Sequence, residues 1–172
     1  MRSLPVFADL RAYLDWCAAQ GDLARIDQPV SLRHEMTAVQ LACLRRAGPV
    51  LEFPRHDGPQ MRVVSNLFGT PDRVAAGLGL TPDKVAEFGE FLAALRSPAP
   101  VAGMRDALTR WPMLRAALAT RPKILRSGPV QERELSGLDQ IPVQTPWPGD
   151  AGPLITWPVV ITRPHGTEPA AL

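Results

Sequence analysis

The 172-residue sequence predicts a mixed α/β (α+β) fold in which the pattern of expected helices and strands changes near residue 121. Before that point, segments with apolar residues at helical spacing alternate with short apolar runs typical of strands. Beyond Arg121-Pro122, prolines divide the chain into short extended pieces. We therefore expect an α/β domain in residues 1–120 and a second region, built mostly of strands, in residues 121–172.

The expected helices lie in the first 120 residues, where apolar side chains three and four positions apart share one helix face. Gly21 ends the first helix and Gly48-Pro49 ends the second. Thr70-Pro71 and Thr81-Pro82 each place a hydroxyl N-cap before a proline, the favoured order at a helix start. Trp111-Pro112 divides the last helical segment into two short helices. The expected helices cover residues 7–20, 36–44, 71–79, 82–96 and 104–120.

The expected strands are short apolar runs that end at proline or glycine. Residues 50–53 and 61–67 flank the turn-rich segment PRHDGPQ, so they form a hairpin or two neighbouring strands. A turn, SGLDQIP, precedes the last strand region. The expected strands cover residues 23–26, 50–53, 61–67, 123–127, 129–135 and 154–163.

The segment TPWPGDAGPLITW, residues 145–157, places two tryptophans in a proline-rich loop. Its prolines restrict φ and remove N–H donors, while Gly149-Asp150 and Gly152 supply tight turns. We expect the loop to hold Trp147 and Trp157 in fixed positions.

The composition is that of an ordinary globular chain, with 45% hydrophobic and 21% charged residues and a net charge of +2. Basic residues are dispersed and Arg45-Arg46 is the only adjacent pair, which argues against a nucleic-acid-binding surface. No apolar run is long enough for a membrane span and no secretion signal is evident, so we expect a cytoplasmic protein. Cys17 and Cys43 lie in apolar helical patterns and are expected to be buried, reduced thiols.

Short motifs with a known chemical role are missing from the sequence. His34-Glu35 lacks the second histidine of a zinc-protease helix, because position 38 is alanine. The glycines of GLGL, residues 77–80, are typical of a helix end and not of a dinucleotide-binding loop. His56 and His165 stand beside turn residues and are expected to be loop side chains.

Three blocks in a fixed order carry a family resemblance. They are DLRAYLDWCAAQGDLARIDQPV, NLFGTPDRVAAGLGL and IPVQTPWPGDAGPLITWPVVITR, at residues 9–30, 66–80 and 141–163. Together they resemble the N-terminal part of the UbiD family, decarboxylases of the 3-polyprenyl-4-hydroxybenzoate carboxy-lyase type. The resemblance extends from about residue 8 to about residue 165.

The resemblance implies a reversible decarboxylase of aromatic or α,β-unsaturated acids that uses prenylated FMN, Mn²⁺ and K⁺. It also implies that residues 1–120 form the family's N-terminal α/β domain and residues 121–172 the start of its central split β-barrel, which binds flavin. Thr156 matches a family position that lines the flavin pocket. The resemblance further implies that the full enzyme forms a homo-oligomer.

Where the family has a segment with a metal-binding Asn and, five residues later, an active-site Arg, this chain reads PHGTEPAAL. The family's metal-binding His and Glu and its acidic proton donor would lie further on. No catalytic or metal-binding residue of the family therefore maps onto this chain, and we expect it to bind no cofactor and to show no turnover alone. We interpret it as the N-terminal part of a UbiD-like carboxy-lyase whose partner is the remainder of the enzyme. The alternative is a non-catalytic interaction or scaffold module that retains the fold. The coding sequence downstream of Leu172 discriminates between the two.

Overall fold

The computed structural model describes residues 6–96, 111, 115, 126–128, 131–156, 158, 160 and 162. The chain divides into two compact units. One unit comprises Met1–Pro82 and Leu135–Val159, and the other comprises Asp83–Glu134 and Val160–Leu172. Each unit is described by itself.

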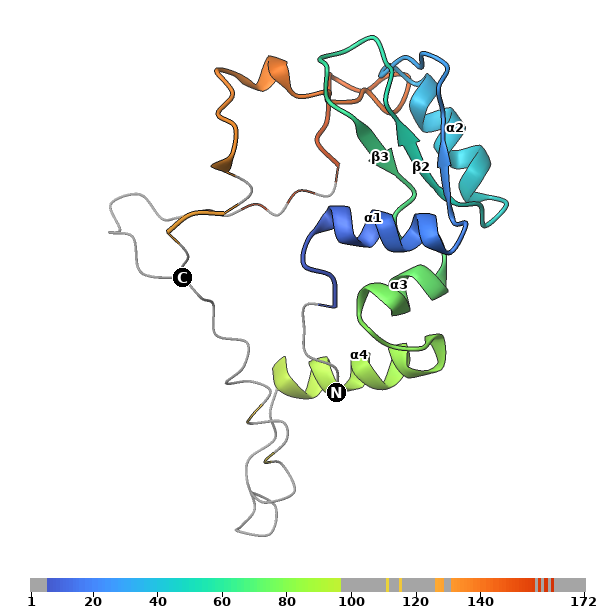
Figure 1. Ribbon diagram of the computed structural model, residues 1–172, viewed down its shortest axis with the longest axis vertical. Coiled ribbons are helices and arrows are strands. Elements are labelled where there is room, and N and C mark those ends of the chain that lie inside the picture. Colours follow the sequence, from blue (N-terminus) through green and yellow to red (C-terminus); the bar gives the residue numbers. More distant parts are fainter. Residues whose placement is uncertain are drawn as a thin grey trace. The chain divides into compact units, whose positions relative to one another are not determined.

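A three-stranded mixed sheet lies at the centre of the first unit (Figure 1). Its strands are β1 (Leu23–Arg25), β2 (Val50–Phe53) and β3 (Val63–Ser65), in that order across the sheet. β1 runs parallel to β2, whereas β2 and β3 are antiparallel. The antiparallel pair confirms the expected neighbouring strands, although β3 is shorter than expected.

Three helices belong to the same unit: α1 (Leu10–Ala19), α2 (Glu35–Leu44) and α3 (Pro71–Gly77). Asp9 caps α1 by accepting a hydrogen bond of 2.9 Å from the backbone N–H of Ala12. Thr70 caps α3 by accepting one of 3.3 Å from Arg73 N, with Pro71 in the first turn as expected. All three helices confirm predicted segments, with ends that differ by a few residues.

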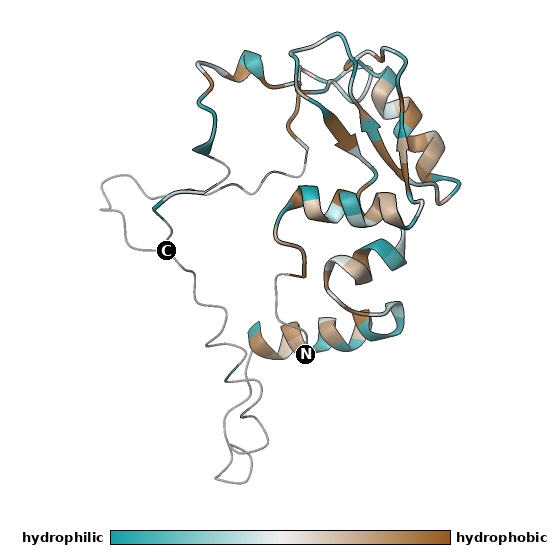
Figure 2. Ribbon diagram, in the orientation of Figure 1, coloured by the Kyte–Doolittle hydropathy of each residue, from teal (hydrophilic) through white to brown (hydrophobic). Residues whose placement is uncertain are grey.

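The two faces of β2 meet different helices because successive side chains of a strand point to opposite sides. Leu51 and Phe53 pack with Met36 of α2, which lies along one face of the sheet (Figure 1). Val50 packs with Tyr13 and Cys17 of α1. Figure 2 shows hydrophobic colour on β3 and, interrupted by a hydrophilic stretch, on β2. Met36 and Phe53 have no exposed surface, and burying each contributes about 2–3 kcal/mol.

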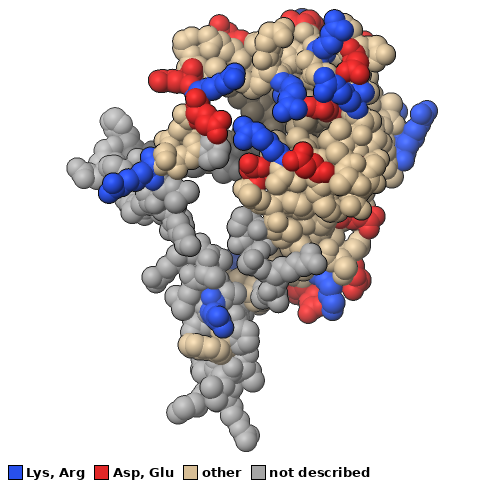
Figure 3. Space-filling view, viewed as in Figure 1, with Lys and Arg blue, Asp and Glu red and all other residues tan. Residues whose placement is uncertain are grey.

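Charged side chains surround this core in pairs of opposite sign. Glu52, on the strand face opposite Leu51 and Phe53, is 8% exposed and bonds Arg62 Nη1 at 2.7 Å, with Arg25 Nη1 at 3.8 Å. Figure 3 shows basic and acidic residues interspersed over the visible face of the described residues. This mixture agrees with the dispersed charges of the sequence.

The described part of the second unit contains α4 (Val85–Arg96), which follows the 3₁₀ turn η1 (Pro82–Lys84). The helix predicted from Thr81-Pro82 is thereby confirmed, with a tighter first turn. Lys84 Nζ lies 2.9 Å from Glu87 Oε2 and the rings of Phe88 and Phe91 stack. The helices predicted in residues 104–120 lie outside the described residues, apart from positions 111 and 115.

The predicted strands beyond residue 121 are not formed where the structure describes them. Residues 131–135 contain no strand, and residues 138–140 form the short 3₁₀ helix η3 (Leu138–Gln140) in the expected turn. In place of a strand from Leu154, a single antiparallel bridge joins Leu154 to Gln144. The prolines on either side of this bridge lack N–H donors, so a longer ladder cannot form through them. Positions 123–125, 129–130 and most of 157–163 lie outside the described residues.

Large apolar side chains are exposed in the described residues that follow residue 134. Leu138 is 73% exposed, Leu154 57% and Ile155 48%. Within the described residues, no helix has the length and apolar character that a membrane crossing requires.

Candidate functional site

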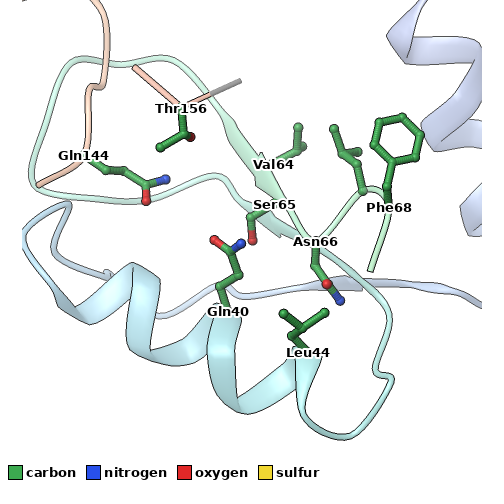
Figure 4. A pocket seen from close by; sticks show the side chains of 9 residues that line it. Gln40, Leu44, Val64, Ser65, Asn66, Phe68, Gln144 and Thr156 are labelled. Carbon is green, nitrogen blue, oxygen red and sulfur yellow. The ribbon is translucent and has the colours of Figure 1, made fainter. Parts of the chain in front are cut away.

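Thr156, the one residue that the family resemblance assigns to a cofactor pocket, lies on a cavity of about 310 Å³. The cavity is formed by three segments of the first unit: α2, the end of β3 with its following turn, and the paired residues 144 and 154–156 (Figure 4). Its lining consists of Gln40, Leu44, Val64, Ser65, Asn66, Leu67, Phe68, Gln144 and Thr156.

Helix α2 contributes Gln40 and Leu44 to the cavity. Met36, Gln40 and Leu44 are four residues apart and follow one stripe of the helix. Met36, at the start of that stripe, is fully buried against the sheet, and Gln40 and Leu44 continue it along the cavity. Glu35 starts the helix, and its Oε2 accepts a hydrogen bond of 2.7 Å from Ser31 N.

The turn after β3 fixes the position of Ser65. Asn66 has a positive φ of 59°, and its side-chain amide donates to Gly48 O at 3.0 Å and Pro49 O at 2.8 Å. A Cβ at Gly69 would overlap Asn66 Oδ1, so glycine is required at that position. The exit of β3 is thereby tied to the loop that precedes β2.

Buried Arg73 braces the same turn from α3. Its Nη1 donates to Asp22 Oδ2 at 2.8 Å and its Nη2 to Gly48 O at 2.9 Å, while its side chain is only 2% exposed. Gly48 O therefore accepts from both Arg73 and Asn66. The loops at Asp22, Gly48 and Asn66 therefore meet around the Arg73 guanidinium. We call this cluster the base of the cavity, because Ser65 directly precedes Asn66.

The third segment of the cavity, formed by residues 144 and 154–156, is held in place by hydrogen bonds between residues far apart in sequence. Thr145 N donates to Leu32 O at 3.1 Å and His34 N donates to Thr145 O at 2.9 Å. Gln144 Nε2 contacts Met36 Sδ at 3.1 Å, and Gln144 O accepts from Leu154 N at 2.8 Å. These contacts bring Thr156 beside α2.

Asp57 secures the segment to which Thr145 is bonded. Its carboxylate accepts from the backbone N–H of Leu32 at 2.8 Å and from the Ser31 hydroxyl. The Leu32 bond, and then the Ser31 bond, lower the pKa of Asp57 below its ordinary value, because both favour the ionised form. Asp57 therefore acts on the cavity indirectly, through the loop at residues 31–34.

The cavity is lined by uncharged polar side chains and apolar side chains. Ser65 Oγ is buried and has no hydrogen-bond partner among the described residues. The side chains of Gln40 and Thr156 also form no hydrogen bond there. An unpaired buried hydroxyl costs about 1–3 kcal/mol, so the uncommitted Ser65 Oγ favours a hydrogen-bonding occupant.

This lining does not fit the charged parts of prenylated FMN with Mn²⁺ and K⁺. A phosphate needs cations or aligned N–H donors, and the lining contains no Lys or Arg. A divalent metal needs several carboxylate or imidazole ligands, and the described residues include no group of three or more that could hold one. The role of Thr156 in cofactor binding thus stays a prediction, and its exposed side chain lies at the rim of the cavity.

The other residues that the sequence analysis considered, His56, Cys17 and Cys43, do not line the cavity. His56 Nε2 lies 2.6 Å from Met61 O, and its Nδ1 accepts from Gly58 N at 3.2 Å, which commits both ring nitrogens. Cys17 and Cys43 are free thiols, Cys17 buried and Cys43 half-buried. Burial raises the pKa of the Cys17 thiol.

The proline-rich loop forms a tight turn at Trp147. Trp147 N donates to Asp150 Oδ2 at 2.8 Å, Asp150 N donates to Trp147 O at 3.2 Å, and Gly149 has a φ of +95°. The indole is 52% exposed. The expected tight turn is present, whereas Trp157 lies outside the described residues.

Sequence reasoning did not identify Gln40, Ser65 or Gln144 as cavity residues. Each is a neutral polar residue in a segment without a motif, and the cavity assembles them from positions up to 104 residues apart, Gln40 to Gln144. The one available signal was a polar side chain at positions where the helix and strand patterns otherwise require apolar ones.

Two family models match the chain in succession. Residues 14–92 match the 3-octaprenyl-4-hydroxybenzoate carboxy-lyase N-terminal domain, and residues 123–170 match the Rift-related domain of the same carboxy-lyase. Both matches carry the UbiD name, and together they cover more than half of the chain.

Solved structures show the same relationship. The UbiD-class enzyme HmfF from Pelotomaculum thermopropionicum, in complex with FMN, is similar over 84% of this chain, with a TM-score of 0.58 and 24% identity. An evolved dimeric form of HmfF with prFMN gives a TM-score of 0.53 and 25% identity over 84% of the chain. Vanillic acid decarboxylase from Sedimentibacter hydroxybenzoicus in its open form matches 55% of the chain, with 25% identity and a TM-score of 0.42.

This chain corresponds to less than a third of the length of each of those enzymes. This chain spans 28% of HmfF in its FMN complex, 29% of the evolved form and 21% of the vanillic acid decarboxylase. The two family models and the fold shared with HmfF agree with each other and with the three sequence blocks. The chain therefore belongs to the UbiD family, of which it carries the N-terminal domain and part of the Rift-related domain.

Proposed function

We propose that this chain supplies the N-terminal α/β domain and the opening of the flavin-binding barrel of a UbiD-class carboxy-lyase. Such an enzyme removes or adds CO₂ on aromatic or α,β-unsaturated acids with prenylated FMN. The observation that carries the proposal is the ordered match to both UbiD models, at residues 14–92 and 123–170. We retain residues 1–120 and 121–172 as the extents of the two domains.

The absence of charged side chains from the cavity lining supports the idea that other parts of the enzyme supply the charged groups of the active site. Decarboxylation needs ligands for the cofactor's phosphate and metal, and an acid that protonates the carbon left by CO₂. The cavity lining offers only amides, hydroxyls and apolar side chains. We propose that the charged groups come from the remainder of the enzyme, and that residues 1–172 alone show no turnover.

Partners follow from the same proposal. The main partner is the remaining UbiD polypeptide, and the complete enzyme forms homo-oligomers. The fold similarity to an evolved dimeric form of HmfF supports an oligomeric assembly.

The test is reconstitution in two parts. The 172-residue chain is mixed with reduced prenylated FMN and Mn²⁺, with and without a polypeptide that supplies the rest of a UbiD enzyme. Retained flavin and CO₂ release from a panel of aromatic and α,β-unsaturated acids are then measured. We expect CO₂ release only when both polypeptides are present.

Two results would contradict the proposal. Turnover by the 172-residue chain alone would show that its own residues complete the site. Tight flavin binding by the reconstituted pair without CO₂ release from any acid would favour the scaffold role.

A further inference from the structure

An apolar groove of about 470 Å³ lies in the first unit, beside the segment that holds Thr156. Seven of its eight lining residues are apolar, and the exception, Asp139, is exposed. Leu138 and Ile155 line the groove although 73% and 48% of their surfaces are exposed. Apolar side chains of the groove are therefore in contact with water, and a partner that covers them gains hydrophobic stabilisation.

The groove lies where the two matched domains of the chain meet. Leu32 falls within the match to the N-terminal domain, residues 14–92. Val143 and Ile155 fall within the match to the Rift-related domain, residues 123–170. A segment seated in the groove therefore contacts both domains.

Three extended segments are paired beside the groove. Isolated bridges join Arg33 to Thr145 in parallel and Gln144 to Leu154 in antiparallel orientation. The N–H and C=O of Thr145 bond the first segment, whereas Gln144 O accepts from Leu154 N at 2.8 Å. The middle segment is thus bonded on both sides, and among the described residues the segment at Leu154 forms the outer edge.

Ile155 presents its backbone to this edge. The N–H of Leu154 points toward Gln144, and in an extended segment the N–H of the next residue points the other way. The Ile155 N–H forms no hydrogen bond within the described residues. The Ile155 side chain lines the groove together with that of Val143, which lies opposite it in the antiparallel register. An unpaired strand edge beside an apolar surface is a template for another strand.

We propose that the groove and the Ile155 edge receive one strand from the remainder of the enzyme's Rift-related domain. The strand bonds the N–H and C=O of Ile155 and places an apolar side chain against Leu138 and Val143. The edge belongs to the part of the chain that matches the Rift-related domain, so the added strand continues the sheet of that domain. This inference rests on the proposed function, because the occupant comes from the part of the enzyme that this chain, at 28% of the length of HmfF, does not span.

Amide hydrogen exchange in the 172-residue chain alone tests whether the edge is open. We expect Leu154 to exchange slowly, because its N–H is bonded to Gln144 O, and Ile155 to exchange as fast as an unstructured amide. Protection of Ile155 equal to that of Leu154 would overturn the proposal, because the edge would already be occupied. Protection of Ile155 that rises with the concentration of the chain would also overturn it, because a second copy would be the occupant.

Assembly with the complementary UbiD polypeptide of the reconstitution tests the occupant. We expect the Ile155 amide to exchange at least about tenfold more slowly in the pair than in the chain alone. Calorimetric titration of the same polypeptide into the chain and its variants measures the affinity.

Two variants assign the assembly to the groove. Leu138→Asp places a charge among apolar lining residues at a position that is 73% exposed, so the fold is retained. Ile155→Pro removes the outward N–H and keeps the bond between Leu154 and Gln144. We expect each variant to weaken assembly about tenfold or more. Leu10→Asp makes the same change at a side chain of α1 that is 49% exposed and outside the groove, and it should leave assembly unchanged.

Unchanged affinity in either groove variant would overturn the proposal, and so would unchanged exchange of Ile155 in the pair. CO₂ release by a pair that gives these results would leave the proposed function standing and refute the groove alone. Assembly through the groove without CO₂ release would refute the proposed function alone, and absence of assembly would refute both. The two failures are therefore distinguishable.

Discussion

The ion pair between Arg73 and Asp22 offers a quantitative test of how the base of the cavity is held. Arg73 is 2% exposed and its Nη1 lies 2.8 Å from Asp22 Oδ2, whereas the Asp22 side chain is 36% exposed. In Asp22→Asn the guanidinium stays buried and loses its counter-charge. Two unit charges about 4 Å apart attract by about 4 kcal/mol at an effective dielectric constant of about 20. Solvent reaches Asp22, so we halve this figure and expect a loss of about 2 kcal/mol.

Hydrogen exchange of the β2 amides measures this loss within the unit that contains the ion pair. A loss of about 2 kcal/mol corresponds to exchange that is about 30-fold faster. Asp27→Asn is the matched control, because Asp27 pairs with Arg25 at 2.9 Å but is 69% exposed. We expect this control to leave exchange unchanged within error.

Truncating the cation should cost more than neutralising the anion. Arg73→Ala also removes the bond to Gly48 O and leaves a cavity, so we expect a loss of about 3–5 kcal/mol. Arg73→Met fills the space with an apolar side chain of similar length and should recover part of that loss. Exchange in Asp22→Asn no faster than in Asp27→Asn would refute the reasoning, since it would mean that the ion pair does not hold the base.

Three further predictions concern the same unit. Tyr13→Phe removes the hydrogen bond of 2.9 Å from the Tyr13 hydroxyl to Leu67 O and should cost about 1 kcal/mol by hydrogen exchange; no change would show that this bond is replaced by solvent. The folded-state pKa of Asp57 is lowered from 3.8, so its contribution to stability is full above about pH 4 and disappears as the pH falls through the lower, folded value. Urea unfolding midpoints between neutral pH and pH 2 should fall more steeply in the wild type than in Asp57→Asn, and parallel curves would contradict this. Cys17 has no exposed surface and a raised thiol pKa, so a thiol reagent at pH 8 should leave it unmodified until urea is added. Modification of Cys17 without denaturant would contradict its burial.

The helices were predictable because their signals are local. Thr70 before Pro71 specifies a helix start through a contact within one turn, and Thr81 before Pro82 carries the same sequence signal; the structure places α3 and the η1–α4 segment there. Asp9 was missed as the cap of α1, so that helix starts three residues later than predicted. The Asp9 cap is also a local signal. It was overlooked because the helical spacing of apolar residues begins at Phe7, before the cap.

The sheet was predictable only in part. The antiparallel pair of β2 and β3 follows from the turn-rich segment between them. The parallel pairing of β1 with β2 joins residues that lie on either side of α2, and no local pattern encodes it. Within the described residues, the strand-like sequence around Leu154 forms a single bridge, because a strand needs neighbours on which to form a ladder.

The cavity was the least predictable feature. Thr156 could be assigned only from the family resemblance, and its exposed position at the rim does not identify what it binds. Ser65 and Gln144 carry no signature in the sequence, because their importance arises from Asn66, Arg73 and Thr145, which place their segments. Such networks depend on contacts between distant residues, and those contacts exist only once the chain has folded.

The most direct test of the central proposal is carboxyl exchange in the reconstituted enzyme. The 172-residue chain, a complementary UbiD polypeptide and prenylated FMN are incubated with an aromatic or α,β-unsaturated acid and ¹³C-labelled bicarbonate, and the label in the acid is measured by mass spectrometry. We predict label in the acid when both polypeptides are present and none when either is omitted. Flavin bound by the pair without label in any acid would contradict the proposed role in a carboxy-lyase.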